Sequence, residues 1–207
     1  VCIALQWSGI SDVALYDLIE QRLNEILVRK IRGGDDLEIA SWYAKGLAAS
    51  GMDKYLTVMR RMASTRQPKL AHYAEESMSR IESYKKWNPI ISDEKNFHPD
   101  QPLQVNRFAN MLKSGDSELK LMALKRMRYE HIYSEYLLDI VRDDLMAGYK
   151  SADATSAGIE VFESETGVLG DSRNMKYHDS LEQVYSETKD RPKLRYSISQ
   201  AMYELKR

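Results

Sequence analysis

The sequence predicts an all-α fold, and three observations lead to that prediction. Pro and Gly are sparse, at 5 and 10 of 207 residues. Apolar residues recur at the helical period of about 3.6 through long segments that short polar breaks separate. Asp or Ser stands where several of these segments start, and Gly stands where several end, as expected for capped helices.

Ten segments carry the helical period. In chain order they are 12–29, 36–50, 53–64, 69–85, 103–113, 117–129, 132–149, 152–165, 175–188 and 193–206. Their starts are marked by side chains that can accept bonds from free N–H groups of a first turn, at Asp12, Asp36, Asp53, Ser117 and Ser151. Several ends are marked by glycine, which enters the left-handed cap conformation at low cost, at Gly33–Gly34, Gly51, Gly115 and Gly148. The segment 167–174 is expected to be a plain connection.

Five of the helices share one apolar stripe, with further stripe residues four, eight and in some cases eleven positions after the first. The first positions are Ile39, Leu70, Leu119, Ala154 and Leu194. Three of the helices place a small residue seven positions after the first, which predicts that a neighbouring helix approaches closely there. These small residues are Gly46, Ser77 and Ala201.

The preceding helices carry a second recurring feature, a tyrosine near their start. Tyr55, Tyr136 and Tyr177 follow one another at 81 (136 − 55) and 41 (177 − 136) positions, which indicates a step of about 40. Two helices per step of about 40 to 47 residues are typical of HEAT- or armadillo-type solenoids.

The chain resembles HEAT-repeat proteins over nearly all of its length. It is also similar to a group of uncharacterised, mostly exported bacterial HEAT-repeat proteins, through S-D-V-A-L-Y-D-L-I-E, W-Y-A-K-G-L-A-A-S-G-M-D-K-Y and K-L-A-H-Y-A-E-E-S-M. The resemblance implies a right-handed α-solenoid of about five helix pairs in a single domain, 1–207. It also implies a protein-binding or scaffold role, and it brings no catalytic residues with it.

Two segments interrupt this pattern. Residues 83–102 contain three prolines and are expected to form an irregular insertion between the second and third pairs. Within it, Trp87 and Phe97 either plug the core or form part of a recognition surface. Residues 1–11 precede the first helix, and the spacing of Cys2 and Ala4 suits a signal peptidase, so 1–4 could be the end of an export signal. A chain boundary, or a short segment packed on the first helix, is the alternative, with a periplasmic or exported location slightly favoured over the cytoplasm.

Composition disfavours several functional classes. With 30 basic and 31 acidic residues the formal charge is −1, so no global field attracts nucleic acid. Cys2 is the only cysteine, which excludes an internal disulfide and a Cys-rich metal site. No histidine has a second one at ligand spacing, and no phosphate loop, nucleophile elbow or dinucleotide fingerprint is present. No apolar run approaches the roughly 18 residues of a membrane span. The sequence therefore predicts no enzyme, no cofactor and no metal.

The leading functional hypothesis is a non-enzymatic module that binds another protein through a curved helical-repeat surface. The expected contact residues lie on the inner helices and in the insertion, and they are Glu38, Ser41, Lys45, Tyr73, Lys120, Arg195, Trp87 and Phe97. One alternative is a HEAT-like DNA glycosylase, with basic clusters at 60–61 and 125–128 and inner-helix aromatics Trp42, Tyr43 and Tyr73. Another is a structural protein that self-assembles through 194–205 or the first helix.

Overall fold

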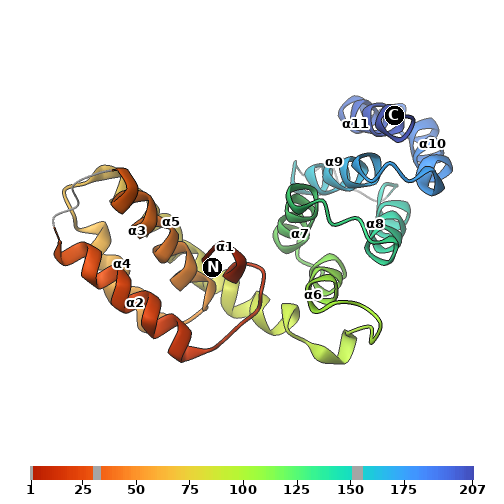
Figure 1. The fold of residues 1–207 in the computed structure, drawn as a ribbon. Coiled ribbons are helices and arrows are strands. Elements are labelled where there is room, and N and C mark those ends of the chain that lie inside the picture. Colours follow the sequence, from red (N-terminus) through yellow and green to blue (C-terminus); the bar gives the residue numbers. More distant parts are fainter. Residues whose placement is uncertain (1, 30–33, 151–155) are drawn as a thin grey trace. The chain divides into compact units, whose positions relative to one another are not determined.

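The computed structural model describes residues 2–29, 34–150 and 156–207. Within these ranges the chain forms eleven α-helices and three 3-10 turns, with no β-strand. The predicted all-α class is therefore confirmed. The chain divides into two compact units, residues 1–97 and 98–207, and each is described by itself (Figure 1). Three residues named in the predictions lie outside the described residues. They are Ala154, the first position of one apolar stripe, Ser151, a predicted helix start, and Gly33, a predicted helix end.

The first unit contains two helix pairs and a short N-terminal helix. Its elements are α1 (Cys2–Leu5), α2 (Val13–Val28), α3 (Gly34–Ala49), η1 (Asp53–Tyr55), α4 (Leu56–Ala63), α5 (Pro68–Ile91) and η2 (Glu94–Asn96). Helix α2 pairs with α3 and α4 pairs with α5, while α3 and α5 lie side by side as the second helices of the two pairs. Helix α1 packs on α3, and Leu5 and Trp7 of the N-terminal segment are buried. The segment also contacts the first long helix, since the Tyr16 hydroxyl of α2 donates to the Ile10 carbonyl at 2.9 Å.

The second unit contains three helix pairs. Its elements are α6 (Leu103–Leu112), α7 (Ser117–Glu130), α8 (Glu135–Gly148), α9 (Ser156–Asp171), η3 (Met175–Tyr177), α10 (His178–Glu187) and α11 (Pro192–Leu205). The pairs are α6 with α7, α8 with α9 and α10 with α11, and α9 lies between α7 and α11.

The first position of the predicted stripe is buried in three of the helices and exposed in one. Leu70, Leu119 and Leu194 are all at most 3% exposed. Ile39, however, is 42% exposed, and α3 instead buries Ala40, while the later stripe residues Gly46 and Leu47 are buried as predicted. A shift of one position turns a helical face by about 100°. The alanine-rich α3 offers the same period on the adjacent face, and small side chains let that face pack closely.

The predicted insertion at 83–102 is wrong in its first half, because α5 runs on to Ile91 and includes Pro89. Buried side chains on the extra turns explain this continuation. Trp87 is 2% exposed and meets Tyr84 edge-on, with ring centroids 5.3 Å apart. The Asn88 amide donates to the carbonyls of the last turn of α3 and of the residue that follows it, at 2.9 and 3.2 Å. These contacts outweigh the helix-breaking effect of a proline placed in the last turn.

Burial also excludes one predicted contact residue. Since Trp87 belongs to the core of the first unit, its assignment to a recognition surface is wrong. Phe97, which follows η2, is half-buried. The irregular stretch is 92–102, and the boundary between the two units falls within it.

The segment 167–174 was expected to be a connection, yet α9 continues to Asp171. Val168 and Leu169 are fully buried, which draws this turn into the helix. At Gly170, α9 crosses α11 so closely that an added Cβ would lie 2.6 Å from the Cα atom of Ala201. Ala201 is one of the small residues predicted to permit such an approach, and that prediction is confirmed at this crossing.

An arrangement of three side chains occurs in both units, 122 positions apart (177 − 55). The Tyr55 hydroxyl, at the end of η1, donates to the Asp17 carboxylate in α2 at 2.9 Å, and Lys54 pairs with the same carboxylate at 2.5 Å. We call this set of three the clasp. It ties the turn before α4 back to α2.

The second clasp consists of Asp139, Lys176 and Tyr177. The Tyr177 hydroxyl, at the end of η3, donates to the Asp139 carboxylate in α8 at 3.1 Å. The Lys176 ammonium donates to the same carboxylate at 3.0 Å. The third predicted tyrosine, Tyr136, lies in α8 and accepts a bond from Lys113 at 3.3 Å, so it has no such carboxylate. The two clasps place α2, α3 and α4 in correspondence with α8, α9 and α10.

The turns after α3 and α9 support the same correspondence. The Ser50 hydroxyl donates to the Leu47 carbonyl at 2.6 Å, and the Ser172 hydroxyl donates to the Leu169 carbonyl at 2.6 Å. The next residue has positive φ in both turns, 68° at Gly51 and 53° at Arg173. Helix α11 corresponds to α5 at an offset of 124 (192 − 68), because α10 is two residues longer than α4.

Removal of either clasp hydroxyl is expected to weaken the fold. Tyr55→Phe and Tyr177→Phe each leave a carboxylate without its phenolic donor, and each should lower the melting temperature by about 2 to 4 °C. Tyr136→Phe is the control and should change it by much less, because its hydroxyl meets only an exposed lysine at 3.3 Å. Thermal unfolding followed by circular dichroism measures the three shifts. Equal shifts in all three variants would contradict a structural role for the clasps.

Candidate functional site

A groove of about 500 Å³ lies on the first unit, between the exposed faces of α3 and α5. Its described lining residues all come from these two helices. They are Gly34, Asp35, Leu37, Glu38, Ser41, Trp42, Lys45, Lys69 and Tyr73. The α3 members recur at three- and four-residue spacing, which places them on one side of the helix.

The groove contains an ammonium group beside two aromatic rings. The Lys45 Nζ atom lies 4.9 Å from the ring centroid of Tyr73 and 5.6 Å from that of Trp42. Attraction between the cation and the ring faces holds this side chain in place. The nearest carboxylate, that of Glu76, lies 3.8 Å from the ammonium. This distance is that of a loose ion pair, longer than a hydrogen bond.

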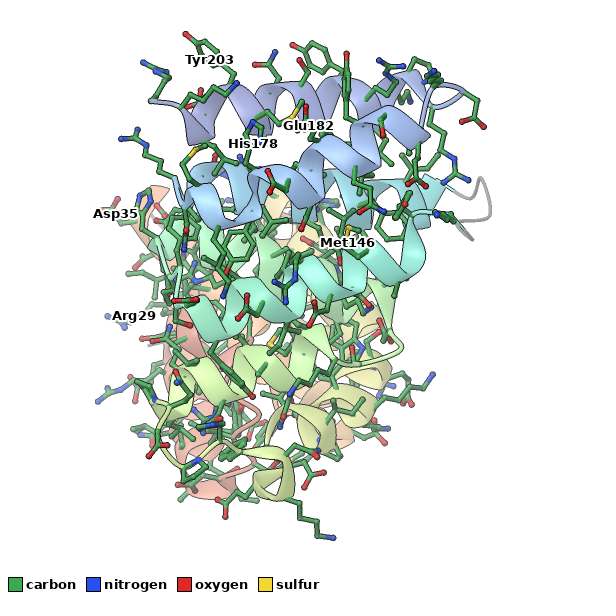
Figure 2. All side chains as sticks on the ribbon, turned by 90° about the vertical axis from the view of Figure 1, so that its right-hand side faces the viewer. Arg29, Asp35, Met146, His178, Glu182 and Tyr203 are labelled. Atoms are coloured by element: carbon green, nitrogen blue, oxygen red, sulfur yellow. The ribbon has the colours of Figure 1, made fainter. Side chains whose placement is uncertain are left out.

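The acidic residues of the groove lie toward the start of α3. Asp35 belongs to the first turn, where a negative charge is favourable beside free N–H groups. Figure 2 shows it at the edge of the first unit. The Glu38 carboxylate accepts a bond from the Trp42 indole N–H at 3.5 Å. The groove therefore has an acidic end, an aromatic middle and a lysine beyond it.

Four of the eight predicted contact residues meet in this groove: Glu38, Ser41, Lys45 and Tyr73. The prediction placed all four on exposed faces of second helices. Glu38 is exposed and Lys45 and Tyr73 are half-buried, but Ser41 is only 6% exposed, so its predicted exposure is wrong. The other four do not join them. Lys120 pairs with Asp144 in the second unit, and Arg195 stacks on Tyr185 with its guanidinium carbon 4.1 Å from the ring centroid.

The groove residues are not ones that the fold itself requires. At the corresponding positions of the second unit, Ser164 stands for Trp42, Gly167 stands for Lys45, and Ser197 stands for Tyr73. The clasps and serine turns are kept in both units, yet the two aromatic rings and the lysine are present in the first alone. The fold that the two units share therefore does not account for these three side chains.

The second unit contains a buried carboxyl group that sequence reasoning did not identify. Glu165 of α9 is 1% exposed and hydrogen-bonds the Asp144 carboxyl group, while Lys120 of α7 pairs with Asp144. Burial, reinforced by the neighbouring Asp144, raises the pKa of Glu165 to about 10. Glu165 is therefore protonated at neutral pH. The sequence placed this residue at the end of a helix, where burial is not expected.

A second cluster lies on α10, where ligand atoms of His178, Asp179 and Glu182 all come within 4.8 Å of one another. Figure 2 shows His178 and Glu182 close together on this helix. One imidazole and two carboxylates are suitable ligands for a divalent ion such as zinc. The two carboxylates are exposed, and Asp179 is wholly in solvent. The sequence signal for this cluster is the i,i+4 spacing of His178 and Glu182, which a criterion based on pairs of histidines does not detect.

Comparisons with known proteins identify no relative. No family model matches the chain, and no curated protein and no solved structure matches it. Across the described ranges, none of the helices is both long enough and apolar enough to cross a bilayer.

Fluorescence quenching offers a direct test of the groove. Trp42 is half-buried, whereas Trp7 and Trp87 are 8% and 2% exposed. Acrylamide should quench the emission of Trp42 far more than that of the other two. In Trp42→Phe the strongly quenched component should disappear, and Trp7→Phe should retain it. Equal quenching of wild type and Trp42→Phe would show that this indole does not line an open groove.

Proposed function

We propose that the protein is a non-enzymatic interaction module, built as a right-handed solenoid of five HEAT-like helix pairs. In this proposal the α3–α5 groove binds a linear segment of a partner protein. One observation carries the proposal: Trp42, Lys45 and Tyr73 converge on a groove, while the second unit has the same clasps without them. Aromatic side chains supply large contact areas at low entropic cost, and they are enriched where proteins bind one another.

The chemistry of the lining favours binding over catalysis. Ser41, the serine of the lining, donates its hydroxyl proton to the Leu37 carbonyl at 2.8 Å, so no described base activates it. The basic cluster at 125–128, considered for nucleic acid, is engaged in ion pairs. Lys125 pairs with Glu160 at 2.9 Å, and Arg128 pairs with Asp171 at 2.7 Å. Neutralised side chains of this kind gain little from releasing counterions of DNA.

Selection from a library of random displayed peptides tests the proposal. The matched control is the double variant Trp42→Ser/Tyr73→Ser, which introduces the residues of the second unit at these positions. We expect wild-type protein to enrich peptides whose affinity falls at least about tenfold on the double variant, as for the loss of aromatic hot spots. Circular dichroism confirms that the variant is folded. Failure to obtain any peptide sensitive to the double substitution would contradict the proposed function.

A further inference from the structure

The charges in the α3–α5 groove are unequally satisfied. Within the described residues, the Lys45 ammonium donates no hydrogen bond to a protein acceptor, and its nearest carboxylate, that of Glu76, is 3.8 Å away. Lys69, on the α5 side of the groove, makes no ion pair with a described residue. The two acidic residues have local explanations, since Asp35 lies in the first turn of α3 and Glu38 accepts the Trp42 indole bond. The two ammonium groups of the groove therefore have no hydrogen-bonded carboxylate within the described residues, and Lys45 has only the loose ion pair with Glu76.

The surroundings of Lys45 prepare it to bind an anion. Its side chain is 29% exposed, so much of the hydration that a free lysine has is already lost. The rings of Trp42 and Tyr73 hold the ammonium in place but supply no lone pair as an acceptor. An incoming carboxylate would form a charge-assisted hydrogen bond at little further cost in side-chain entropy.

We infer that the groove recognises a carboxylate on a linear peptide, bound by the Lys45 ammonium beside the rings of Trp42 and Tyr73. This inference rests on the proposed function and names the chemistry of its ligand. An Asp or Glu side chain and the C-terminus of a chain both supply a carboxylate. The flanking rings favour an apolar or aromatic neighbour next to it, because ring faces bury apolar groups well.

The second unit supports the assignment by contrast. Gly167 replaces Lys45 there, and the space beside it holds the Arg128 guanidinium, 3.0 Å from where a Cβ would lie. That guanidinium is paired with Asp171 at 2.7 Å. The cation that occupies this place in the second unit, although it comes from another helix, thus has a close carboxylate partner, whereas Lys45 has only a loose one.

The test uses three synthetic forms of a groove-dependent peptide from the displayed library. The first form has its acidic residue and an amidated C-terminus. The second, doubly neutral form has Gln in place of the acidic residue and an amidated C-terminus. The third form has the same Gln and a free C-terminal carboxylate. We expect the first or third form to bind at least about tenfold more tightly than the doubly neutral form, as for a charge-assisted bond. Which of the two binds identifies the source of the carboxylate.

Lys45→Gln should remove this difference between acidic and neutral peptides. Lys86→Gln, which changes an exposed lysine of α5 outside the groove lining, should keep it. Binding is measured by Trp42 fluorescence, and melting curves confirm that both variants are folded. Groove-dependent peptides that bind equally well in all three forms would overturn the carboxylate assignment and leave the proposed function standing. A library that yields no groove-dependent peptide would overturn both.

Discussion

Replacement of Glu165 by Gln is expected to stabilise the protein at neutral and alkaline pH. The wild-type carboxyl group has a pKa of about 10 in the fold, against an ordinary value of 4.5. Between these pH values the folded chain holds a proton that the unfolded chain has released. The free energy of unfolding therefore falls as the pH rises through this range. The contribution of the protonated Glu165 to the stability of the fold is complete only below the pKa that this group has in the unfolded chain.

The size of this effect follows from linkage. One such group changes the free energy of unfolding by about 1.4 kcal/mol per pH unit, which amounts to something on the order of 3 kcal/mol by neutral pH. Gln cannot ionise, and its amide can donate to Asp144 as the protonated acid does. The gain from Glu165→Gln should thus be near zero at about pH 4 and largest near pH 9.

Urea unfolding across this pH range measures the difference. Glu160→Gln is the matched control, since Glu160 is exposed on the same helix and should show no comparable trend. A Glu165→Gln variant with the same pH dependence as wild type would show that Glu165 is ionised in the folded protein.

Gly170→Ala is expected to destabilise the second unit, although alanine is the better helix former. The added Cβ would lie 2.6 Å from the Cα atom and 2.8 Å from the Cβ atom of Ala201, and the Cα atom belongs to the backbone, which cannot turn aside. Overpacking typically costs about 1–3 kcal/mol, and helix propensity returns at most about 1 kcal/mol. We expect a net loss of about 1–2 kcal/mol.

Gly167→Ala, one turn earlier on α9, is the matched control for this substitution. Its Cβ would meet the Arg128 guanidinium at 3.0 Å, and that flexible group can move. Gly167→Ala should therefore be neutral or stabilising in chemical denaturation. If Gly170→Ala were equally harmless, α9 and α11 would not cross at this glycine.

The helices and their pairing followed from the sequence because they depend on local periods and caps. The corrections arose where packing between helices decided the outcome. Alanines in α3 allowed a face other than that of Ile39 to be buried, and the contacts of Trp87 carried α5 through Pro89. The pairing of Glu165 with Asp144 joins positions 21 apart (165 − 144), and no local pattern encodes it.

The candidate site was predictable in part for the same reason. Glu38, Ser41 and Lys45 share one side of a helix, which spacing alone indicates. Helical spacing likewise predicts the face of α5 that carries Tyr73, but it does not predict that the Tyr73 ring contacts Lys45. Trp42 was recognised as an inner-helix aromatic and assigned to the nucleic-acid alternative. The clasps align the two units residue by residue. This alignment distinguishes the groove residues, which occur in the first unit, from the residues that both units share.

The most direct test of the account follows the three indole N–H signals by NMR while a groove-dependent peptide is added. Trp42 lines the groove, and Trp7 and Trp87 are buried in the same unit. The account predicts that the Trp42 signal shifts in proportion to the peptide bound, while the other two stay in place. A bound peptide that leaves the Trp42 signal unmoved would contradict the assignment of function to the α3–α5 groove.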